Sequence, residues 1–329
     1  MPRWLKIVLA ALGLLVLLAL IVPLLWPVPP LEGTEAPAAL ASPEGKFAEI
    51  DGVTIHYTDS GSKDATSAIV LMHGFGASTF SFREVTGGLS DRCRTVAFDR
   101  PAFGLTERPM PPYEAENPYG PEQNARQVLG LLDALGIEQA TLVAHSAGAP
   151  IAVRAALLEP ERIESLVLVA PAVYEARSVP SLVSALLRTP QMRRIGPLFV
   201  RRIAGASTDD FVRSAYYRSD VATPGVIAGY RLPLRAADWD RGLWELVAAP
   251  RGASVADLLG DVTVPSLVVA GREDSFVPYE SSRRVADEIP DARFVTYEQT
   301  GHLPHEERPD QFLTDIYRFL DTLPTAAGG

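Results

Sequence analysis

Only one cysteine, Cys93, occurs in the 329 residues of this chain. No disulfide can therefore form within the chain, and one thiol supports neither a zinc cluster nor a Cys-X-X-Cys redox pair. Cys93 comes just before a predicted strand, where a free thiol is expected to pack as a small apolar side chain. The scarcity of cysteine thus excludes an internal disulfide framework and dithiol redox chemistry.

The chain also lacks an excess of positive charge. It has 30 lysine and arginine residues against 40 aspartate and glutamate residues. This acidic balance argues against a general nucleic-acid binder and leaves room only for a local basic patch. We see no internal repeats, and the length fits two ordinary domains or one large α/β domain with an insertion.

Charged residues are missing from a long stretch near the N-terminus. Residues 7–25 are mostly leucine, valine, isoleucine and alanine, and Trp4 and Trp26 flank them. Roughly 20 apolar residues are enough for a helix to cross a bilayer, and tryptophans are typical of its two interfaces. We therefore expect a transmembrane anchor over residues 1–26, followed by a linker rich in proline and alanine over residues 27–46.

The charges beside this stretch predict its orientation. Arg3 and Lys6 precede it, whereas Glu32 and Glu35 follow it. Basic flanks stay in the cytoplasm, so we expect a single-pass membrane protein with a cytoplasmic N-terminus and the rest of the chain outside. A cleaved signal peptide is the alternative. The apolar run exceeds the usual signal core of ~7–15 residues, and the nearest small-x-small site, at 39–41, lies well beyond its end.

From residue 47 onward, predicted strands alternate with predicted helices. This order indicates an α/β fold with a mostly parallel, doubly wound sheet, whose active sites gather at the carboxyl ends of the strands. The segment 53–57 is expected to form an edge strand. The other expected strands are 68–72, 95–98, 141–145, 165–170, 266–270 and 292–297, and the expected helices are 121–135, 147–158 and 310–320.

Residues 175–260 do not follow this alternation. They are helix-like, interrupted by prolines, and contain 12 arginines, no lysine and 8 acidic residues. Because the segment falls between two core strands, we expect an inserted helical cap that divides the core into residues 47–174 and 261–325, with a tail at 326–329. The apolar cluster at 182–187, together with Trp239 and Trp244, is expected to pack on the core and line a pocket.

The chain is organised around the stretch TLVAHSAGAP at 141–150, where a buried strand runs directly into Ser146 and then into a helix of small residues. A serine at such a corner is the sequence form of a nucleophile elbow. Ala144 and Gly148 are small enough for strand and helix to pass closely. The N–H of Ala147 lies at a helix start, where a developing oxyanion is stabilised. A plain helix N-cap is the alternative interpretation of Ser146.

A serine nucleophile needs a base and a carboxylate that orients it. Asp274 follows the predicted strand 266–270, and His302 follows the strand 292–297. The three candidates therefore lie beyond strand ends on the same edge of the sheet, in the chain order Ser, Asp, His that is typical of one hydrolase architecture.

With these motifs in place, the region from 47 to 323 resembles the capped branch of the α/β-hydrolase superfamily. One departure is Ala144, where the family usually has glycine, although alanine is also small. The resemblance rests on five motifs in the right order: HGFG at 73–76, DRPAFGLTERP at 99–109, AHSAG at 144–148, GREDSFVP at 271–278 and GHLPHEERP at 301–309.

The resemblance implies that Ser146 is the nucleophile, that His302 is the base and then the acid, and that Asp274 orients His302. It places the oxyanion donors at the backbone N–H groups of Phe75 and Ala147. Competing assignments are His145 or His305 as the base and Glu273 as the orienting carboxylate, whereas His73 is interpreted as structural.

These observations predict a membrane-anchored serine hydrolase acting on an uncharged, apolar ester or a similar carbonyl compound through an acyl-enzyme, without metal or organic cofactor. Carbon–carbon bond hydrolases and cofactor-free haloperoxidases share the three residues and stay as alternatives, as does a non-catalytic binding protein of the same fold. Members of the superfamily with aspartate at the elbow are epoxide hydrolases and haloalkane dehalogenases, so the serine here disfavours both activities. The oligomeric state is left open.

Overall fold

Eight strands form one sheet in the order β1-β2-β4-β3-β5-β6-β7-β8. The pairs β1–β2 and β2–β4 are antiparallel, and all the other pairs are parallel. The predicted mostly parallel sheet is therefore confirmed. The strands are β1 (Lys46–Ile50), β2 (Val53–Ser60), β3 (Ser67–Met72), β4 (Arg94–Phe98), β5 (Gln139–His145), β6 (Ile163–Val169), β7 (Ser266–Gly271) and β8 (Ala292–Tyr297).

The computed structural model describes residues 1–63, 67–113, 116–175 and 181–323. The predicted tail at 326–329 lies outside these residues, as do 176–180 at the start of the predicted cap. The expectation of an edge strand at 53–57 is wrong, because β1 pairs along the outer side of β2. That pairing was hidden in the sequence since β1 is short and only its last residue is fully buried.

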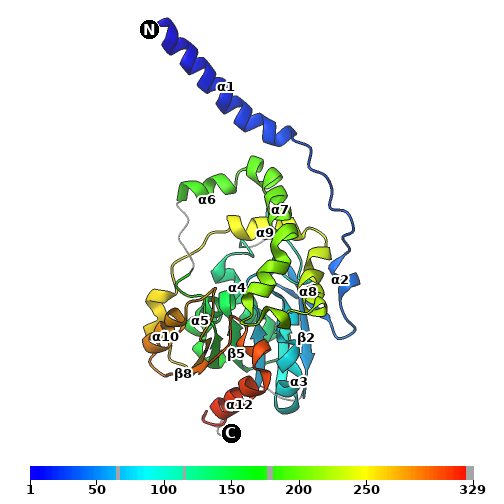
Figure 1. Cartoon of the computed structure of the whole chain (residues 1–329), viewed down its shortest axis with the longest axis vertical. Coiled ribbons are helices and arrows are strands. Elements are labelled where there is room, and N and C mark those ends of the chain that lie inside the picture. The colour runs from blue at the N-terminus through cyan, green and yellow to red at the C-terminus, as the bar shows by residue number, and fades with distance from the viewer. Residues whose placement is uncertain (64–66, 114–115, 176–180, 324–329) are drawn as a thin grey trace.

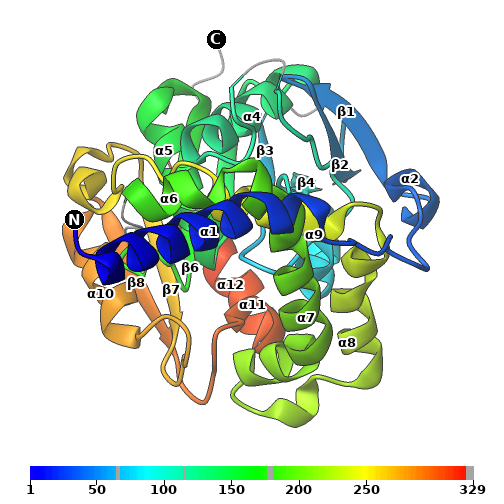
Figure 2. The ribbon, with the colours of Figure 1, turned by 90° about the horizontal axis from the view of Figure 1, so that it is seen from above.

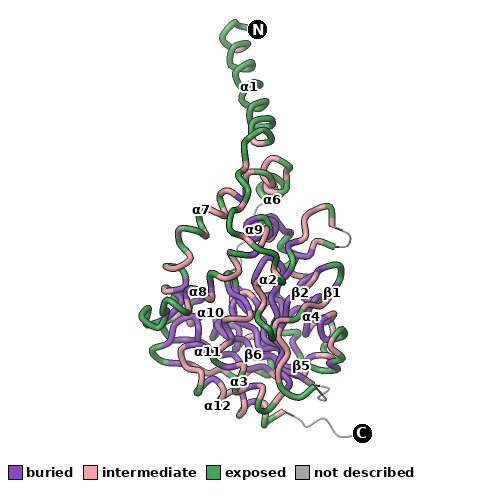
Figure 3. The backbone as a smooth tube through the Cα atoms, turned by 90° about the vertical axis from the view of Figure 1, so that its right-hand side faces the viewer, coloured by how far each residue is buried: buried purple, intermediate pink, exposed green. Residues whose placement is uncertain are grey.

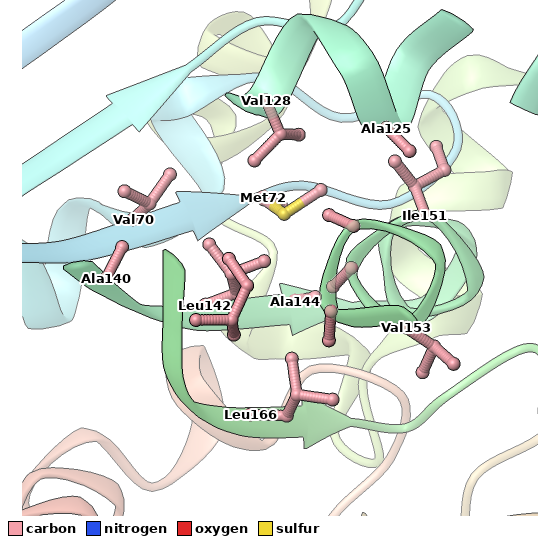
Figure 4. Close-up of a cluster of buried hydrophobic side chains, with 14 of the residues drawn as sticks. Val70, Met72, Ala125, Val128, Ala140, Leu142, Ala144, Ile151, Val153 and Leu166 are labelled. Carbon is pink, nitrogen blue, oxygen red and sulfur yellow. The ribbon is translucent and has the colours of Figure 1, made fainter. Parts of the chain in front are cut away.

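Alternation along the central strands divides the core between the two faces of the sheet. Val70 and Met72 of β3 belong to the larger apolar cluster, whereas Ile69 and Leu71 belong to the cluster on the opposite face. Successive side chains of a strand point to opposite faces, so a strand covered on both sides reads as an unbroken apolar run. Figure 4 shows Val70 and Met72 packed beneath Val128 of the helix above.

Helices cover both faces of this sheet, with α4 and α5 on one side and α12 on the other (Figure 2). The larger cluster includes side chains of α4, α5 and α10, and the other cluster includes side chains of α3 and α12. The helices are α1 (Arg3–Leu25), α2 (Pro37–Leu40), α3 (Arg83–Arg92), α4 (Pro121–Ala134), α5 (Ala149–Leu158), α6 (Ser181–Leu187), α7 (Pro190–Ala215), α8 (Pro224–Arg231), α9 (Trp239–Ala248), α10 (Tyr279–Glu288), α11 (Pro304–Glu307) and α12 (Pro309–Leu320).

The four helices α6 to α9 fall between β6 and β7, and Figure 1 shows α6, α7 and α9 on the side of the sheet nearest α1. The predicted packing of the apolar cluster at 182–187 is wrong, whereas Trp239 and Trp244 are buried. Leu182, Val183 and Leu186 of α6 are exposed rather than packed on the core. Trp244 packs against Gly196 of α7 and lines a small cavity of about 140 Å³, so α9 turns other residues towards the main cavity.

Helix α1 projects from the rest of the chain, and its residues are largely exposed (Figures 1 and 3). It is long and apolar enough to cross a bilayer, a test that an N-terminal signal sequence also passes. The chain then returns to the globular part through Glu35. The Glu35 N–H donates to the carbonyl of Arg235, and the N–H of Ala237 donates back to the carbonyl of Glu35, each at 2.8 Å.

Candidate active site

Ser146 lies at a strained corner between β5 and α5. Its φ angle is +50°, in the left-handed region that a residue with a side chain seldom adopts. A Cβ atom at Gly148 would lie 2.8 Å from the carbonyl oxygen of Met72, so only glycine allows the helix to pass this close to β3. Strain and close packing together hold the Ser146 hydroxyl at the carboxyl end of the sheet.

Ser146, His302 and Asp274 are joined by hydrogen bonds. The distance from His302 Nε2 to Ser146 Oγ is 2.9 Å, and that from His302 Nδ1 to Asp274 Oδ2 is 2.8 Å. The other carboxylate oxygen of Asp274 accepts hydrogen bonds from the backbone N–H groups of Phe276, at 2.8 Å, and Val277, at 3.0 Å. The three predicted residues therefore meet, and the carboxylate is fixed from both sides.

Two loops that follow β7 and β8 bring Asp274 and His302 together. Glu273 lies beside Asp274 but accepts a hydrogen bond from the backbone N–H of Thr300 at 3.0 Å, so it joins the two loops. A Cβ atom at Gly271 would lie 2.0 Å from the carbonyl oxygen of Gly301, which shows how closely the loops approach. The hydrogen bond to His302 thus belongs to Asp274, and Glu273 braces the loop.

The His145 ring lies 4.6 Å from the His302 ring, and the His305 ring lies 4.9 Å from the His145 ring, each pair in a tilted arrangement. His145 and His305 are both buried. His145 Nε2 donates to the backbone carbonyl oxygen of His302 at 2.8 Å, which supports the loop that carries His302. Burial lowers the pKa of both neighbours, for His305 to about 3, and so keeps them uncharged. The described hydrogen bond of the Ser146 hydroxyl is to Nε2 of His302 and not to either of these two histidines.

His73 and Arg100 fix the loop that follows β3. His73 Nε2 accepts the backbone N–H of Arg100 at 3.0 Å, and burial lowers the pKa of His73 to about 3. The Arg100 side chain donates to the carbonyl oxygens of His73, at 3.0 Å, and Gly74, at 3.1 Å. This bracing agrees with the structural interpretation of His73 and immobilises the backbone just before Phe75, one of the two predicted oxyanion donors.

The end of α7 is attached directly to the loop of His302, a connection that the sequence pattern did not reveal. The backbone N–H of His302 donates to the carbonyl of Ala215 at 2.7 Å. The carboxylate of Glu307 accepts the N–H of Tyr217 at 2.9 Å with one oxygen and the N–H of Gly301 at 2.8 Å with the other. Motion of α7 would therefore be transmitted to His302.

A second connection between these segments is buried. The Glu306 carboxylate lies 2.8 Å from a guanidinium nitrogen of Arg83 and accepts hydrogen bonds from the hydroxyls of Tyr216 and Tyr230. Burial raises the pKa of Glu306, and the Arg83 charge opposes that shift. In the sequence, Glu306 resembles an ordinary exposed residue in the first turn of a helix, so only the fold discloses its three partners.

A cavity of about 790 Å³ opens above Ser146 and His302. Phe75 and Ala147, the two predicted oxyanion donors, border it. Within the described part of the chain, no group of three or more His, Cys, Asp or Glu side chains could hold a metal ion. The apolar part of the wall includes Ile151, Val173, Phe211, Val212, Leu246, Val247 and Phe276.

Three arginines also line this cavity, and protein groups engage two of them. Arg100 donates to backbone carbonyls, as described above. Arg154 is buried and donates to the Glu122 carboxylate and to the carbonyl of Ala253. The third, Arg251, is exposed. The two buried positive charges of the wall are therefore already bound by acceptors of the chain itself.

A nucleophile elbow on a mostly parallel sheet, with a serine, a histidine and an aspartate at the strand ends, is the arrangement of an α/β hydrolase. The family model described as "alpha/beta hydrolase fold" matches residues 67–309. The chain therefore belongs to the alpha/beta hydrolase fold family, which confirms the resemblance found in the sequence.

Individual relatives are hydrolases of different kinds. The chain is 29% identical to "Uncharacterized hydrolase YugF" of Bacillus subtilis over 280 residues, which cover 85% of this chain and 98% of the relative. It is also 29% identical to a 2-hydroxymuconate semialdehyde hydrolase of Pseudomonas sp. (strain CF600), over 87% of this chain and 97% of the relative. The crystal structure of the enol-lactonase from Burkholderia xenovorans LB400 matches with a TM-score of 0.67 and 25% identity, covering 84% of this chain and 100% of the enzyme.

Proposed function

We propose that this protein is a membrane-anchored serine hydrolase that cleaves uncharged, apolar esters through Ser146, His302 and Asp274. The observation that carries the proposal is the 2.9 Å contact between Ser146 Oγ and His302 Nε2 at a largely apolar cavity. In this mechanism His302 takes the hydroxyl proton while Ser146 attacks the ester carbonyl. Backbone N–H groups of Phe75 and Ala147 stabilise the oxyanion.

The rest of the cycle follows from the same groups. The leaving alcohol takes the proton from His302, and an acyl-enzyme on Ser146 remains. A water molecule then gives a proton to His302 and attacks the acyl carbon. When the second tetrahedral intermediate breaks down, His302 returns the proton to Ser146 and the carboxylic acid leaves. Asp274 keeps Nδ1 of His302 protonated and stabilises the imidazolium formed in each half-reaction.

Two observations favour ester hydrolysis. The lactone group cleaved by the enol-lactonase relative is itself an ester, and the buried arginines of the cavity already have acceptors. A carbon–carbon bond hydrolase is the second candidate, because several relatives at 28–29% identity are named as enzymes for 2-hydroxymuconate semialdehyde or related dienedioates. A substrate that carries a carboxylate would bind better beside a cationic side chain of the cavity wall, and the exposed Arg251 is the candidate for that contact.

We also propose that residues 175–260 act as a cap that selects substrates and that α1 anchors the chain, with the catalytic domain outside the cytoplasm. The position of α7 and α9 along the cavity wall supports the first point, and the length, composition and basic flank of α1 support the second. Alkaline washing of membranes tests the anchor: full-length protein should stay in the membrane fraction, whereas a mature chain beginning after Ala41 would reveal a cleaved signal.

The reaction itself is tested by offering the detergent-solubilised full chain two sets of compounds. One set is p-nitrophenyl esters of increasing chain length, and the other is 2-hydroxymuconate semialdehyde and a dienedioate analogue. Turnover of the esters with labelling of Ser146 by a fluorophosphonate supports the proposal. Cleavage of the second set alone would replace the proposed ester hydrolase with a carbon–carbon bond hydrolase. If neither set is turned over and Ser146 is not labelled, the protein would be a non-catalytic binding protein.

A further inference from the structure

Five large apolar side chains lie exposed on α6 and on α7 up to its middle. The exposed fractions are 80% for Leu182, 43% for Val183, 55% for Leu186, 55% for Phe199 and 67% for Ile203. The two helices contact each other, so we treat these residues as one surface and call it the α6–α7 face. A soluble surface rarely exposes large apolar side chains in such a group, and a concentration of them marks a contact with another apolar phase.

The charge of the same segment is of one sign. Residues 181–208 contain five arginines and neither aspartate nor glutamate. Arg193 and Arg201 are paired with Glu245 and Asp240 of α9. The remaining three, Arg188, Arg194 and Arg202, are exposed. A helix with an exposed apolar face flanked by arginines is the pattern of a segment that lies in the interface of a bilayer containing anionic lipids.

The position of α1 relative to this face supports a lipid partner. The Gln191 side chain donates to the carbonyl of Leu20 at 3.1 Å, and the Arg194 side chain donates to the carbonyl of Trp26 at 3.2 Å. Helix α1 ends at Leu25, so Leu20 lies roughly 7–8 Å inside that end. Interfacial helices are buried about 5–10 Å into a membrane surface, so the start of α7, at Gln191, lies at that level beside α1. Figure 3 shows α1 rising from the globular part at α6 and α7.

We infer that the α6–α7 face lies in the interface of the bilayer that holds α1, with its apolar side chains among the acyl chains and its arginines at anionic phospholipid headgroups. This inference rests on the proposed anchoring by α1. Because α7 and α9 also line the main cavity, the contact holds that cavity against the membrane. An ester dissolved in the bilayer would therefore reach Ser146 more readily than it would if only the linker joined the domain to the membrane.

Spin labels on the full-length chain test the contact directly. The parent is the Cys93→Ser variant, reconstituted in vesicles of phosphatidylcholine and phosphatidylglycerol. Single labels are placed at Leu186→Cys and Ile203→Cys on the face, at Leu14→Cys in α1, and at Asp310→Cys in α12, at the opposite end of the molecule (Figure 1). At 186 and 203 we expect oxygen, which concentrates in the bilayer, to relax the label more than a water-soluble nickel chelate does. The label at 14 should behave in the same way. At 310 the nickel chelate should relax the label more than oxygen does.

The pattern of labels separates this inference from the anchoring itself. A label at 14 in the bilayer with labels at 186 and 203 in water would overturn the contact and leave the anchor intact. Labels at 186 and 203 that neither reagent reaches would show a second copy of the chain on the face and would also overturn it. All three labels in water would overturn both the anchor and the contact.

An activity measurement tests the consequence. The variant Leu182→Gln, Leu186→Gln, Ile203→Gln should hydrolyse a long-chain ester in vesicles about tenfold more slowly than the parent, because it loses three apolar groups from the membrane contact. Its rate on a soluble short ester in detergent should stay within about twofold. Leu158→Gln, an exposed leucine on α5, is the matched control. An equal loss of rate on both substrates would contradict the inference. A parent protein that is inactive on both substrates would contradict the proposed hydrolase function, and the spin labels would still decide whether the membrane contact exists.

Discussion

The backbone N–H of His302 donates a 2.7 Å hydrogen bond to the carbonyl oxygen of Ala215 at the end of α7. The same α7 lines the cavity through Phe211 and Val212. One helix therefore contacts both the space where substrate would bind and the loop that carries the proposed base. If binding shifts α7, the distance between His302 and Ser146 would change, and this would connect substrate binding to the proposed chemistry.

Removal of the Ser146 hydroxyl should abolish hydrolysis. In Ser146→Ala we expect turnover to fall on the order of 10⁶-fold, the loss typical of a nucleophile in such a set of residues. Thermal unfolding should change little. Ser146→Gly should be equally inactive and no less stable than Ser146→Ala, because glycine adopts the φ of +50° without strain. Steady-state kinetics and melting curves check both, and substantial residual activity of a pure preparation would place the nucleophile elsewhere.

Asp274→Asn should retain the fold but lose activity. Asparagine can still accept the N–H groups of Phe276 and Val277, but it cannot hold His302 in the required tautomer or stabilise its charged form. By analogy with triads of this kind, turnover should fall about 10⁴-fold. Glu273→Gln is the matched control, since Glu273 binds the backbone of Thr300, and it should lose far less. A reversal of the two effects would reassign the carboxylate.

Glu307→Gln should slow turnover more than it weakens substrate binding. The substitution leaves either the N–H of Gly301 or that of Tyr217 without its acceptor, so the His302 loop loosens from the end of α7. We expect a lower kcat with little change in KM, and a loss of about 1–2 kcal/mol in the free energy of unfolding. Glu280→Gln, an exposed glutamate of α10, serves as the control. If KM alone rises, Glu307 acts on binding and not through His302.

The buried histidines should make stability fall with acidification. Burial lowers the pKa of His73 and His305 from 6.5 to about 3. Between these values the unfolded chain binds protons that the folded chain does not. The free energy of unfolding should therefore decrease as pH falls through this window, by about 1.4 kcal/mol per pH unit for each histidine, and the contribution is fully present above pH ~6.5.

Comparison of His305→Phe with its parent isolates one of these contributions. Urea unfolding of the detergent-solubilised proteins from pH 7 to pH 4.5 should show a shallower decline for the variant, by about 1.4 kcal/mol per pH unit at most. Burial raises the pKa of Glu306, which has the opposite effect on stability at low pH, but that residue is present in both proteins. Identical slopes would mean that His305 titrates normally in the folded chain.

The residues of α9 that face the cavity should influence chain-length preference. Leu246→Trp adds bulk to the wall, and we expect kcat/KM to fall about 10-fold or more for a long acyl chain while a short one is affected little. Trp244→Phe is the control, because Trp244 packs on α7 and lines the smaller cavity. A change in the long-to-short ratio for Trp244→Phe alone would show that the original expectation for the tryptophans was right.

The sequence by itself determined the parallel part of the sheet, the family and the candidate residues. Buried parallel strands read as continuous apolar runs, and residues just after such runs must gather at one edge, so Ser146, Asp274 and His302 could be selected without coordinates. The small residues around Ser146 also indicate the elbow in the sequence, because the close approach of strand and helix leaves no space for larger side chains there.

Only the tertiary structure decided which groups support that site. The hydrogen bonds of Glu306 and Glu307 to the end of α7 span about 90 residues of sequence and leave no periodic pattern. The orientation of α9 and the exposure of α6 were likewise hidden, because an apolar helix face has the same spacing whether it packs on a core, lines a cavity or contacts a lipid. Periodicity reports that a face is apolar, and the surrounding fold determines what covers it.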